Sequence, residues 1–271
     1  MQVVRAGGLD IAYVREGDGP PLVLVHGAGD DSRIWRPQLA DLADEFTVVA
    51  WDEPGAGRSS NVPAGFDLAG YANSLGALMD ALELGPSHVA GLSWGGTVAL
   101  ELYRHRPELV GTLILADTYA GWKGSLPESE VESRVAAVRA MLAGPPGRLD
   151  PILAGSFAGE PPPRYVPLLR KIAAGMRPES LMTQLDVMAQ TDQRDLLPRI
   201  SVPTLLIWGE LDARSPLAVA RQFEMAIEGA QVVILPGAGH LSNLEQPERF
   251  TDAVRVFCHE HADAAASGAG D

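Results

Sequence analysis

The chain contains 271 residues, of which 46% are hydrophobic and 21% charged, enough apolar material for a large buried core. Its 35 acidic and 21 basic residues give a formal net charge of −14, which disfavours nucleic acids and anionic membranes as partners. The single cysteine, Cys258, excludes an internal disulfide and is expected to pack in a C-terminal helix.

Residues 1–13 alternate short apolar and polar side chains and lack the basic flank and apolar core of a signal peptide. The longest apolar runs have the length of a strand, whereas a membrane helix needs about twenty residues. We therefore expect a cytoplasmic protein without a membrane span.

The first buried strand is predicted at residues 22–25, and it runs into the loop 26–29 (HGAG). The backbone of such a loop can approach a ligand closely, so Gly27 is a candidate substrate contact and the N–H of Ala28 a candidate oxyanion donor. His26 is expected to brace this loop by hydrogen bonding.

A strand at residues 46–51 leads into the loop 52–59 (DEPGAGRS). Asp52 follows a strand end, where parallel-sheet enzymes collect site residues, but the glycines of the loop favour a structural role in shaping the sheet edge. Arg58 is expected to bind a carboxylate or a backbone carbonyl.

A strand at residues 88–92 enters the turn 91–95 (GLSWG), which opens a helix at 97–106. Such a turn holds its serine in a strained conformation with Oγ exposed, and the flanking glycines relieve crowding. Ser93 is therefore a candidate nucleophile, and the N–H of Trp94 is the second candidate oxyanion donor. The alternative is a serine that only caps the helix.

The regular alternation of strand and helix stops after a strand at residues 109–116. Between residues 119 and 198, Pro, Gly and Met accumulate around predicted helices at 128–142, 149–157, 165–174 and 178–190. We interpret this segment as a helical cap whose apolar side roofs the site, since a cavity between cap and sheet has no other wall.

The side chains expected to line that cavity, whose alternative role is packing, are Trp35, Trp122, Phe157 and Met182. The arginines of the cap are expected to be solvated, with recognition of a substrate carboxylate as the alternative; they are Arg134, Arg139, Arg164 and Arg170.

After the cap, residues 204–208 (TLLIW) predict a buried strand, and Asp212 lies in the turn that follows. A strand at 231–235 leads to the loop that ends in His240. A nucleophilic serine needs a base to take its proton and a carboxylate to hold that base in its productive tautomer. His240 is therefore the candidate base and Asp212 the favoured acid. Asp117, at the end of an earlier strand, is the competing acid, or else caps the entry into the cap.

Together these segments predict an α/β fold with a mostly parallel, doubly wound sheet and a helical cap insertion. Residues 1–118 and 199–261 are predicted to form the core, 119–198 the cap, and 262–271 a disordered tail with too little bulk to pack. A further strand is predicted at residues 10–15, and helices are predicted at 34–44, 67–83, 97–106, 216–227 and 247–261.

No spacing of His, Cys, Asp and Glu matches a metal site, and no glycine loop carries the Lys and Ser or Thr of a phosphate-binding loop. The expected chemistry therefore uses no cofactor and no metal. The remaining histidines are expected at helix ends or on the surface, and they are His88, His105, His259 and His261.

Several segments resemble landmarks of the α/β-hydrolase family, in the order of that family and along nearly the whole chain. They are HGAG (26–29), DEPGAGRS (52–59), GLSWGG (91–96), GELD (209–212) and GAGHLSNLEQPERF (237–250). The last segment looks most like small-molecule members such as 3-oxoadipate enol-lactonases, carbon–carbon bond hydrolases and small esterases. The resemblance implies an α/β-hydrolase fold with a Ser-Asp-His triad. Two departures concern pocket shape: Trp94 stands where many relatives carry Met or Gln, and Ala28 replaces a larger residue.

The leading hypothesis is a serine hydrolase that cleaves a small ester or lactone through an acyl-enzyme. One alternative is a carbon–carbon bond hydrolase that acts on a vinylogous diketone with the same triad. Another is a ligand receptor on the same fold without turnover. A small-molecule substrate is the only partner predicted, and no feature of the sequence indicates an oligomeric state.

Overall fold

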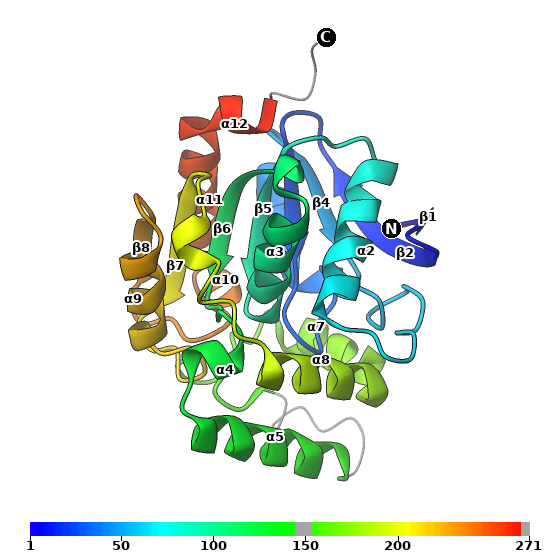
Figure 1. Ribbon diagram of the computed structural model, residues 1–271, viewed down its shortest axis with the longest axis vertical. Helices are drawn as coiled ribbons and strands as arrows, with labels where there is room; N and C mark the ends of the chain where they lie inside the picture. Colours follow the sequence, from blue (N-terminus) through cyan, green and yellow to red (C-terminus); the bar gives the residue numbers. More distant parts are fainter. Residues whose placement is uncertain (145–152, 267–271) are drawn as a thin grey trace.

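An eight-stranded sheet forms the centre of the computed structural model, which describes residues 1–144 and 153–266 (Figure 1). The strand order is β1-β2-β4-β3-β5-β6-β7-β8. The pairs β1–β2 and β2–β4 are antiparallel, and all other neighbours are parallel. The predicted mostly parallel, doubly wound sheet is confirmed. The strands are β1 (Gln2–Ala6), β2 (Leu9–Glu16), β3 (Pro21–Val25), β4 (Thr47–Trp51), β5 (Ser87–Leu92), β6 (Val110–Ala116), β7 (Thr204–Gly209) and β8 (Gln231–Leu235).

Helices pack on both faces of the sheet. One face is covered by α2 (Leu68–Ala81), α3 (Trp94–His105) and α9 (Leu217–Ala226), and α2 and α3 lie in front of the sheet in Figure 1. The other face is covered by α1 (Arg36–Leu42) and α11 (Pro247–Glu260). The sheet therefore separates two hydrophobic cores.

Successive residues of each central strand contribute to opposite cores. In β3, Val23 and Val25 belong to the core under α2 and α3, whereas Leu22 and Leu24 belong to the core under α1 and α11. This double burial explains why the parallel strands are apolar throughout in the sequence.

Local sequence determines several helix ends. The Asp67 side chain caps α2 by accepting a hydrogen bond from the N–H of Gly70 at 2.8 Å. Pro247 occupies the first turn of α11, where its missing N–H has no helical partner to lose. Asp31 caps a 3₁₀ helix, Ser32–Trp35, so the predicted helix 34–44 is divided between that turn and α1.

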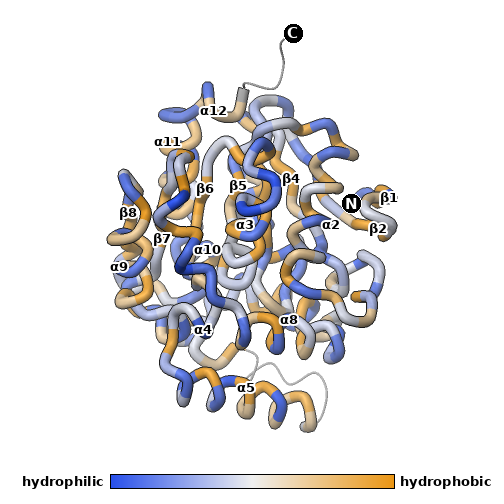
Figure 2. The backbone as a smooth tube through the Cα atoms, viewed as in Figure 1, coloured by the Kyte–Doolittle hydropathy of each residue, from blue (hydrophilic) through white to orange (hydrophobic). Residues whose placement is uncertain are grey.

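Four helices of the segment 119–198 lie together beyond one end of the strands, at the bottom of Figure 1. Residues along α5 alternate between hydrophilic and hydrophobic, as Figure 2 shows. The predicted helix 149–157 lies partly outside the described residues, and its described part is mostly turn. The division of the chain into core and cap stays a prediction. The four helices are α4 (Trp122–Ser125), α5 (Glu128–Leu142), α7 (Val166–Gly175) and α8 (Pro178–Gln190).

The structure differs from the sequence prediction mainly at short elements. The sequence prediction did not include β1, α4, α10 (Ser242–Glu245) or the 3₁₀ turns Pro107–Leu109 and Leu197–Arg199. One-turn helices are too short to show a 3.6-residue period, so no pattern reveals them.

Part of the predicted C-terminal tail is helical. Residues Ala262–Ala266 form α12, which packs against β6. Alanine is the best helix former, and Gly111 of β6 leaves the space that α12 occupies: a Cβ on Gly111 would lie 2.3 Å from the Ala264 carbonyl oxygen. Residues 267–271 of the predicted tail lie outside the described residues.

The prediction for His88 was wrong. This residue is fully buried in β5, where its Nδ1 is 2.9 Å from the Thr112 hydroxyl of β6. Burial lowers the pKa of His88 to about 4, so its ring is neutral at physiological pH.

Cys258 is buried in α11 as predicted. Within the two described ranges, no helix has both the length and the apolar content needed to cross a membrane.

Candidate functional site

Ser93 lies in the turn between β5 and α3, with φ of 54° and ψ of −121°. Positive φ is unfavourable for a residue with a Cβ, so the surroundings must enforce it. The turn around Ser93 is packed tightly enough to require glycine at both flanking positions. A Cβ on Gly91 would lie 2.4 Å from the Gly95 carbonyl oxygen, and a Cβ on Gly95 would lie 2.1 Å from the Val25 carbonyl oxygen. Larger residues at either position would push the turn out of place.

The Ser93 hydroxyl, the His240 imidazole and the Asp212 carboxylate form a continuous chain of hydrogen bonds. His240 Nε2 is 2.9 Å from Ser93 Oγ, and His240 Nδ1 is 2.8 Å from Asp212 Oδ2. The Asp212 carboxylate accepts a hydrogen bond from the Nδ1–H of His240, which leaves the Nε2 lone pair directed at the serine. The structure thus brings together three side chains that are far apart in the sequence.

Backbone donors hold the Asp212 carboxylate in place. Its Oδ1 accepts hydrogen bonds from the N–H groups of Arg214 and Ser215, both at 2.8 Å. Asp212 and His240 are 5% and 3% exposed, so water screens their interaction weakly.

Asp117, the competing acid, bonds to other partners. It accepts hydrogen bonds from the Gly209 N–H at 2.8 Å and from the Ser242 hydroxyl at 2.5 Å. Burial, and then the neighbouring Asp212 carboxylate, raise the pKa of Asp117 well above its usual range. The neutral form of Asp117 is therefore favoured.

The two candidate oxyanion donors flank the serine. The backbone N–H groups of Ala28 and Trp94 take no part in the turn and loop hydrogen bonds of the described residues. His26 is fully buried, and its Nδ1 is 2.9 Å from the Gly27 carbonyl oxygen. The N–H of Glu53 donates to His26 Nε2 at 3.2 Å, so a neutral imidazole links the two loops.

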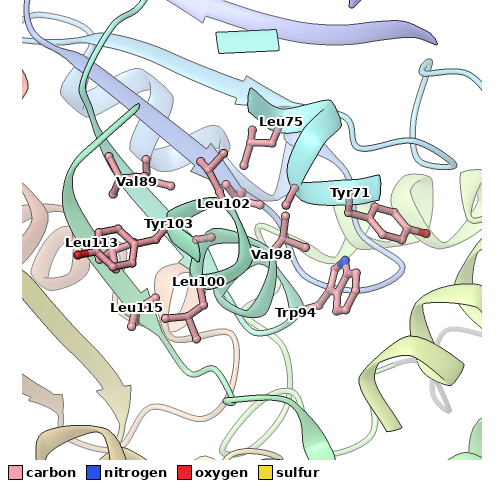
Figure 3. Close-up of a cluster of buried hydrophobic side chains, with 14 of the residues drawn as sticks. Tyr71, Leu75, Val89, Trp94, Val98, Leu100, Leu102, Tyr103, Leu113 and Leu115 are labelled. Carbon is pink, nitrogen blue, oxygen red and sulfur yellow. The ribbon is translucent and has the colours of Figure 1, made fainter. Parts of the chain in front are cut away.

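A buried carboxylate that sequence reasoning missed connects these loops to α8. Glu53 is fully buried, and its carboxylate accepts hydrogen bonds from the Trp94 indole N–H at 2.8 Å and from the Gln184 side-chain amide. The amide oxygen of Gln184 accepts the N–H of Gly29 at 3.1 Å. Burial raises the pKa of Glu53, and the two donors oppose that rise. The indole of Trp94 also packs against Tyr71 of α2, with the ring centroids 5.2 Å apart (Figure 3).

A cavity of about 560 Å³ opens beside Ser93 and His240. Its walls are mainly apolar and come from α5, α7 and α8 on one side and from the strand-end loops on the other. Gly27, Ala28 and Trp122 line it, as the sequence predicted. The cavity fits a small, largely apolar molecule whose reactive group reaches the serine. Further apolar lining comes from Val138, Met141, Leu169, Ile172, Leu185 and Met188.

Three of the predicted substrate contacts are corrected, because among the described residues the cavity lining does not include them. Trp35 and Phe157 are buried in the core under α1 and α11, and the Trp35 ring packs against Phe250. Met182 lies on α8 one position after Leu181, which lines the cavity, so a turn of about 100° carries it away. Periodicity placed the helix correctly but did not reveal which face turned inward.

Arg134 differs from the solvated arginine that the sequence predicted. It lines the cavity and donates to the Tyr119 hydroxyl at 2.9 Å and to the Arg214 carbonyl at 2.7 Å. Arg139 forms an exposed ion pair with Asp186, and Arg164 and Arg170 are exposed.

The loop 52–59 is held by an arginine from elsewhere in the chain. Arg58 is exposed, whereas Arg177 donates to the carbonyls of Gly57 and Ser59. The Asp52 carboxylate accepts the N–H groups of Ser32 and Arg58, which is the structural role predicted for it.

Comparison with known proteins gives a consistent result. A model of the alpha/beta hydrolase family matches residues 22–253. A thermophilic esterase from Thermogutta terrifontis, solved with malate bound, is 31% identical, with a TM-score of 0.85 over 96% of this chain and 100% of its own. The enol-lactonase from Burkholderia xenovorans LB400 is 25% identical, with a TM-score of 0.80 over 95% of this chain and 100% of its own. A pimeloyl-acyl-carrier-protein methyl ester esterase from Vibrio vulnificus YJ016 is 28% identical over 92% of this chain and 98% of its own.

Proposed function

Because this chain belongs to the α/β hydrolase family and is a hydrolase, we propose that it cleaves a small ester or lactone through a covalent acyl-enzyme on Ser93. The hydrogen-bonded series from Ser93 through His240 to Asp212, beside a mainly apolar cavity, carries this proposal. The esterases and the enol-lactonase among the similar proteins support the same substrate class.

In the proposed first step, His240 Nε2 takes the hydroxyl proton as Ser93 Oγ attacks the substrate carbonyl. The backbone N–H groups of Ala28 and Trp94 donate to the carbonyl oxygen as it becomes negative. Asp212 stabilises the imidazolium that forms. His240 then gives the proton to the leaving alkoxide, and the acyl group stays on Ser93.

In the second step, a water molecule gives a proton to His240 and attacks the acyl carbonyl. The oxyanion collapses, the carboxylic acid leaves, and the proton returns to Ser93 Oγ. For a lactone the alcohol and acid are parts of one molecule, so a single hydroxy acid is released.

The test is hydrolysis of short-chain 4-nitrophenyl esters and of simple lactones by purified protein. Ser93→Ala is expected to lower kcat by more than about a thousandfold without changing thermal unfolding. Ser156→Ala is the matched control, because Ser156 also lines the cavity but is not bonded to His240, and it should retain turnover. Undiminished hydrolysis by Ser93→Ala contradicts the proposal.

The substrate panel also includes a vinylogous diketone. Cleavage of that compound by the wild type but not by Ser93→Ala, without any ester or lactone hydrolysis, would replace the proposed substrate class by carbon–carbon bond cleavage on the same residues.

A further inference from the structure

Asp30 places a carboxyl group beside the nucleophile. It follows the loop 26–29 in a turn closed by its own N–H, which donates to the Gly27 carbonyl at 3.2 Å. The point where a Cβ on Gly27 would sit lies 3.1 Å from Asp30 Oδ2 and 3.6 Å from Ser93 Cβ. Because Gly27 has no side chain, the Asp30 carboxyl group and the Ser93 side chain lie close together, on either side of the space that a Cβ on Gly27 would fill. Asp30 also lines the cavity.

Neighbouring carboxylates are occupied by internal donors, whereas Asp30 is directed at the cavity. Asp31 bonds to the Arg33 guanidinium, Asp52 to backbone N–H groups, and Glu53 to Trp94 and Gln184. Among the described residues, no donor is hydrogen-bonded to the Asp30 carboxyl. A partly buried acid without an internal donor has a hydrogen-bonding requirement that a ligand can meet.

We propose that Asp30 is a specificity-determining residue that accepts a hydrogen bond from an O–H or N–H group of the substrate close to the scissile carbonyl, and that it excludes anionic groups from that position. The preferred substrate class is then an ester or lactone with a hydroxyl or amino substituent near the carbonyl, and a hydrocarbon remainder against the apolar walls. This inference rests on the proposed function.

Electrostatics make the selectivity depend on pH. Burial and the nearby Asp31 raise the pKa of Asp30 to about 7, while Arg214, across the cavity, acts to lower it. The charge of Asp30 in turn raises the pKa of the buried Glu53, and His240 lines the same cavity as Asp30. Below pH 7 the neutral acid tolerates an anionic substrate, and above pH 7 the carboxylate repels it. Discrimination against anions should therefore increase from pH 6 to pH 8.

Three methyl esters of similar size test the proposal: methyl butanoate, methyl 3-hydroxybutanoate and monomethyl succinate, assayed by chromatography of the released methanol. At pH 8 the wild type should prefer the hydroxy ester over methyl butanoate on the order of tenfold in kcat/KM, the effect of one hydrogen bond to a charged acceptor. Monomethyl succinate should be the poorest substrate.

Two substitutions of Asp30 distinguish the effect of its hydrogen bond to the substrate from the effect of its negative charge. Asp30→Asn keeps an acceptor oxygen without the charge, so it should retain part of the hydroxyl preference and lose the discrimination against monomethyl succinate. Asp30→Ala should bring all three esters to within about threefold of one another. Asp31→Asn is the matched control at pH 8. The Arg33-bonded Asp31 lies outside the cavity beside Ser93, and the loss of its charge only favours the ionised form of Asp30, so this variant should keep the wild-type ratios at pH 8.

Wild-type ratios in Asp30→Ala, even with lower absolute rates, overturn the inference, as does a wild type without hydroxyl preference. Both results leave Ser93-dependent ester hydrolysis, and with it the proposed function, intact. Absence of hydrolysis of every ester and lactone instead removes the proposed function and this inference together.

Discussion

Two buried carboxyl groups lie near His240, and their hydrogen bonds give them different roles. Asp212 accepts a hydrogen bond from the Nδ1–H of His240, while Asp117 accepts hydrogen bonds from the Gly209 N–H and the Ser242 hydroxyl. A buried pair of acids does not ionise twice at neutral pH, because the second charge meets both low polarity and like-charge repulsion. The raised pKa of Asp117 favours its neutral form, whereas Asp212 is the acid that is hydrogen-bonded to the imidazole.

Replacement of each acid by its amide tests this assignment. Asp212→Asn should lower kcat for the Ser93-dependent ester by roughly a thousandfold or more, because the amide stabilises the wrong imidazole tautomer. Asp117→Asn replaces a neutral acid by a neutral amide and should lower kcat by less than about tenfold. Steady-state kinetics at pH 8 measure both, and equal losses would show that the two acids share the role.

At the level of single residues, the sequence indicated candidates where the chemistry demanded a residue type. The need for a base and an acid singled out His240 and Asp212, and both lie within hydrogen-bonding distance of their expected partners. It missed Asp30 and Glu53, because an isolated acid in a loop has no spacing partner. Only the fold places one beside the serine and buries the other.

At the scale of elements, one polar network joins the loop after β3, the start of α3 and the helix α8. Its directions follow from the hydrogen bonds, since the N–H groups of Gly29 and Trp94 can only donate and each Glu53 side-chain oxygen accepts one hydrogen bond. Gln184 accepts from one side and donates to the other. We expect this network to hold the candidate oxyanion donors in position relative to the cavity wall.

Glu53→Gln should disturb the network, because its new amide N–H₂ faces either the Trp94 indole or the Gln184 amide, both of which are donors. We expect kcat to fall by about tenfold or more with a smaller change in KM, as for a loss of transition-state positioning. The double variant Glu53→Gln with Gln184→Glu restores matched donors and acceptors and should recover most of kcat. A double variant no better than Glu53→Gln contradicts the directional argument.

The sequence predicted long elements better than short ones. The bounds of α5, α8 and β8 agree with prediction, because apolar periodicity and prolines define them. The hairpin strand β1 was missed, since a mostly exposed edge strand carries a weak pattern. The start of α3 was placed three residues late because a nucleophile turn leads directly into its helix.

At the scale of the whole molecule, buried histidine links stability to pH. Protonation of His88 is opposed by burial, so its pKa is about 4 in the folded state against an ordinary value of 6.5. The unfolded chain therefore binds a proton first on acidification, and the free energy of unfolding falls between pH 6.5 and pH 4. His26 is shifted in the same direction by its burial.

His88→Asn removes this titration while an amide can still bond to Thr112. The stability of the wild type relative to the variant should decrease by about 3 kcal/mol between pH 7 and pH 4, which corresponds to the pKa difference. Urea unfolding at several pH values measures it, and the difference between proteins cancels contributions from the buried acids. Parallel stability profiles would contradict the assignment.

The hydrogen bond between His240 and Ser93 is expected to activate that one serine. Reaction with a fluorophosphonate, followed by peptide mass mapping, tests it directly, because such reagents modify serines whose hydroxyl is deprotonated by a neighbouring base. We expect stoichiometric modification of Ser93 with loss of hydrolysis, and at least about a hundredfold slower modification in His240→Asn. Modification of a different serine, or none in the wild type, would contradict it.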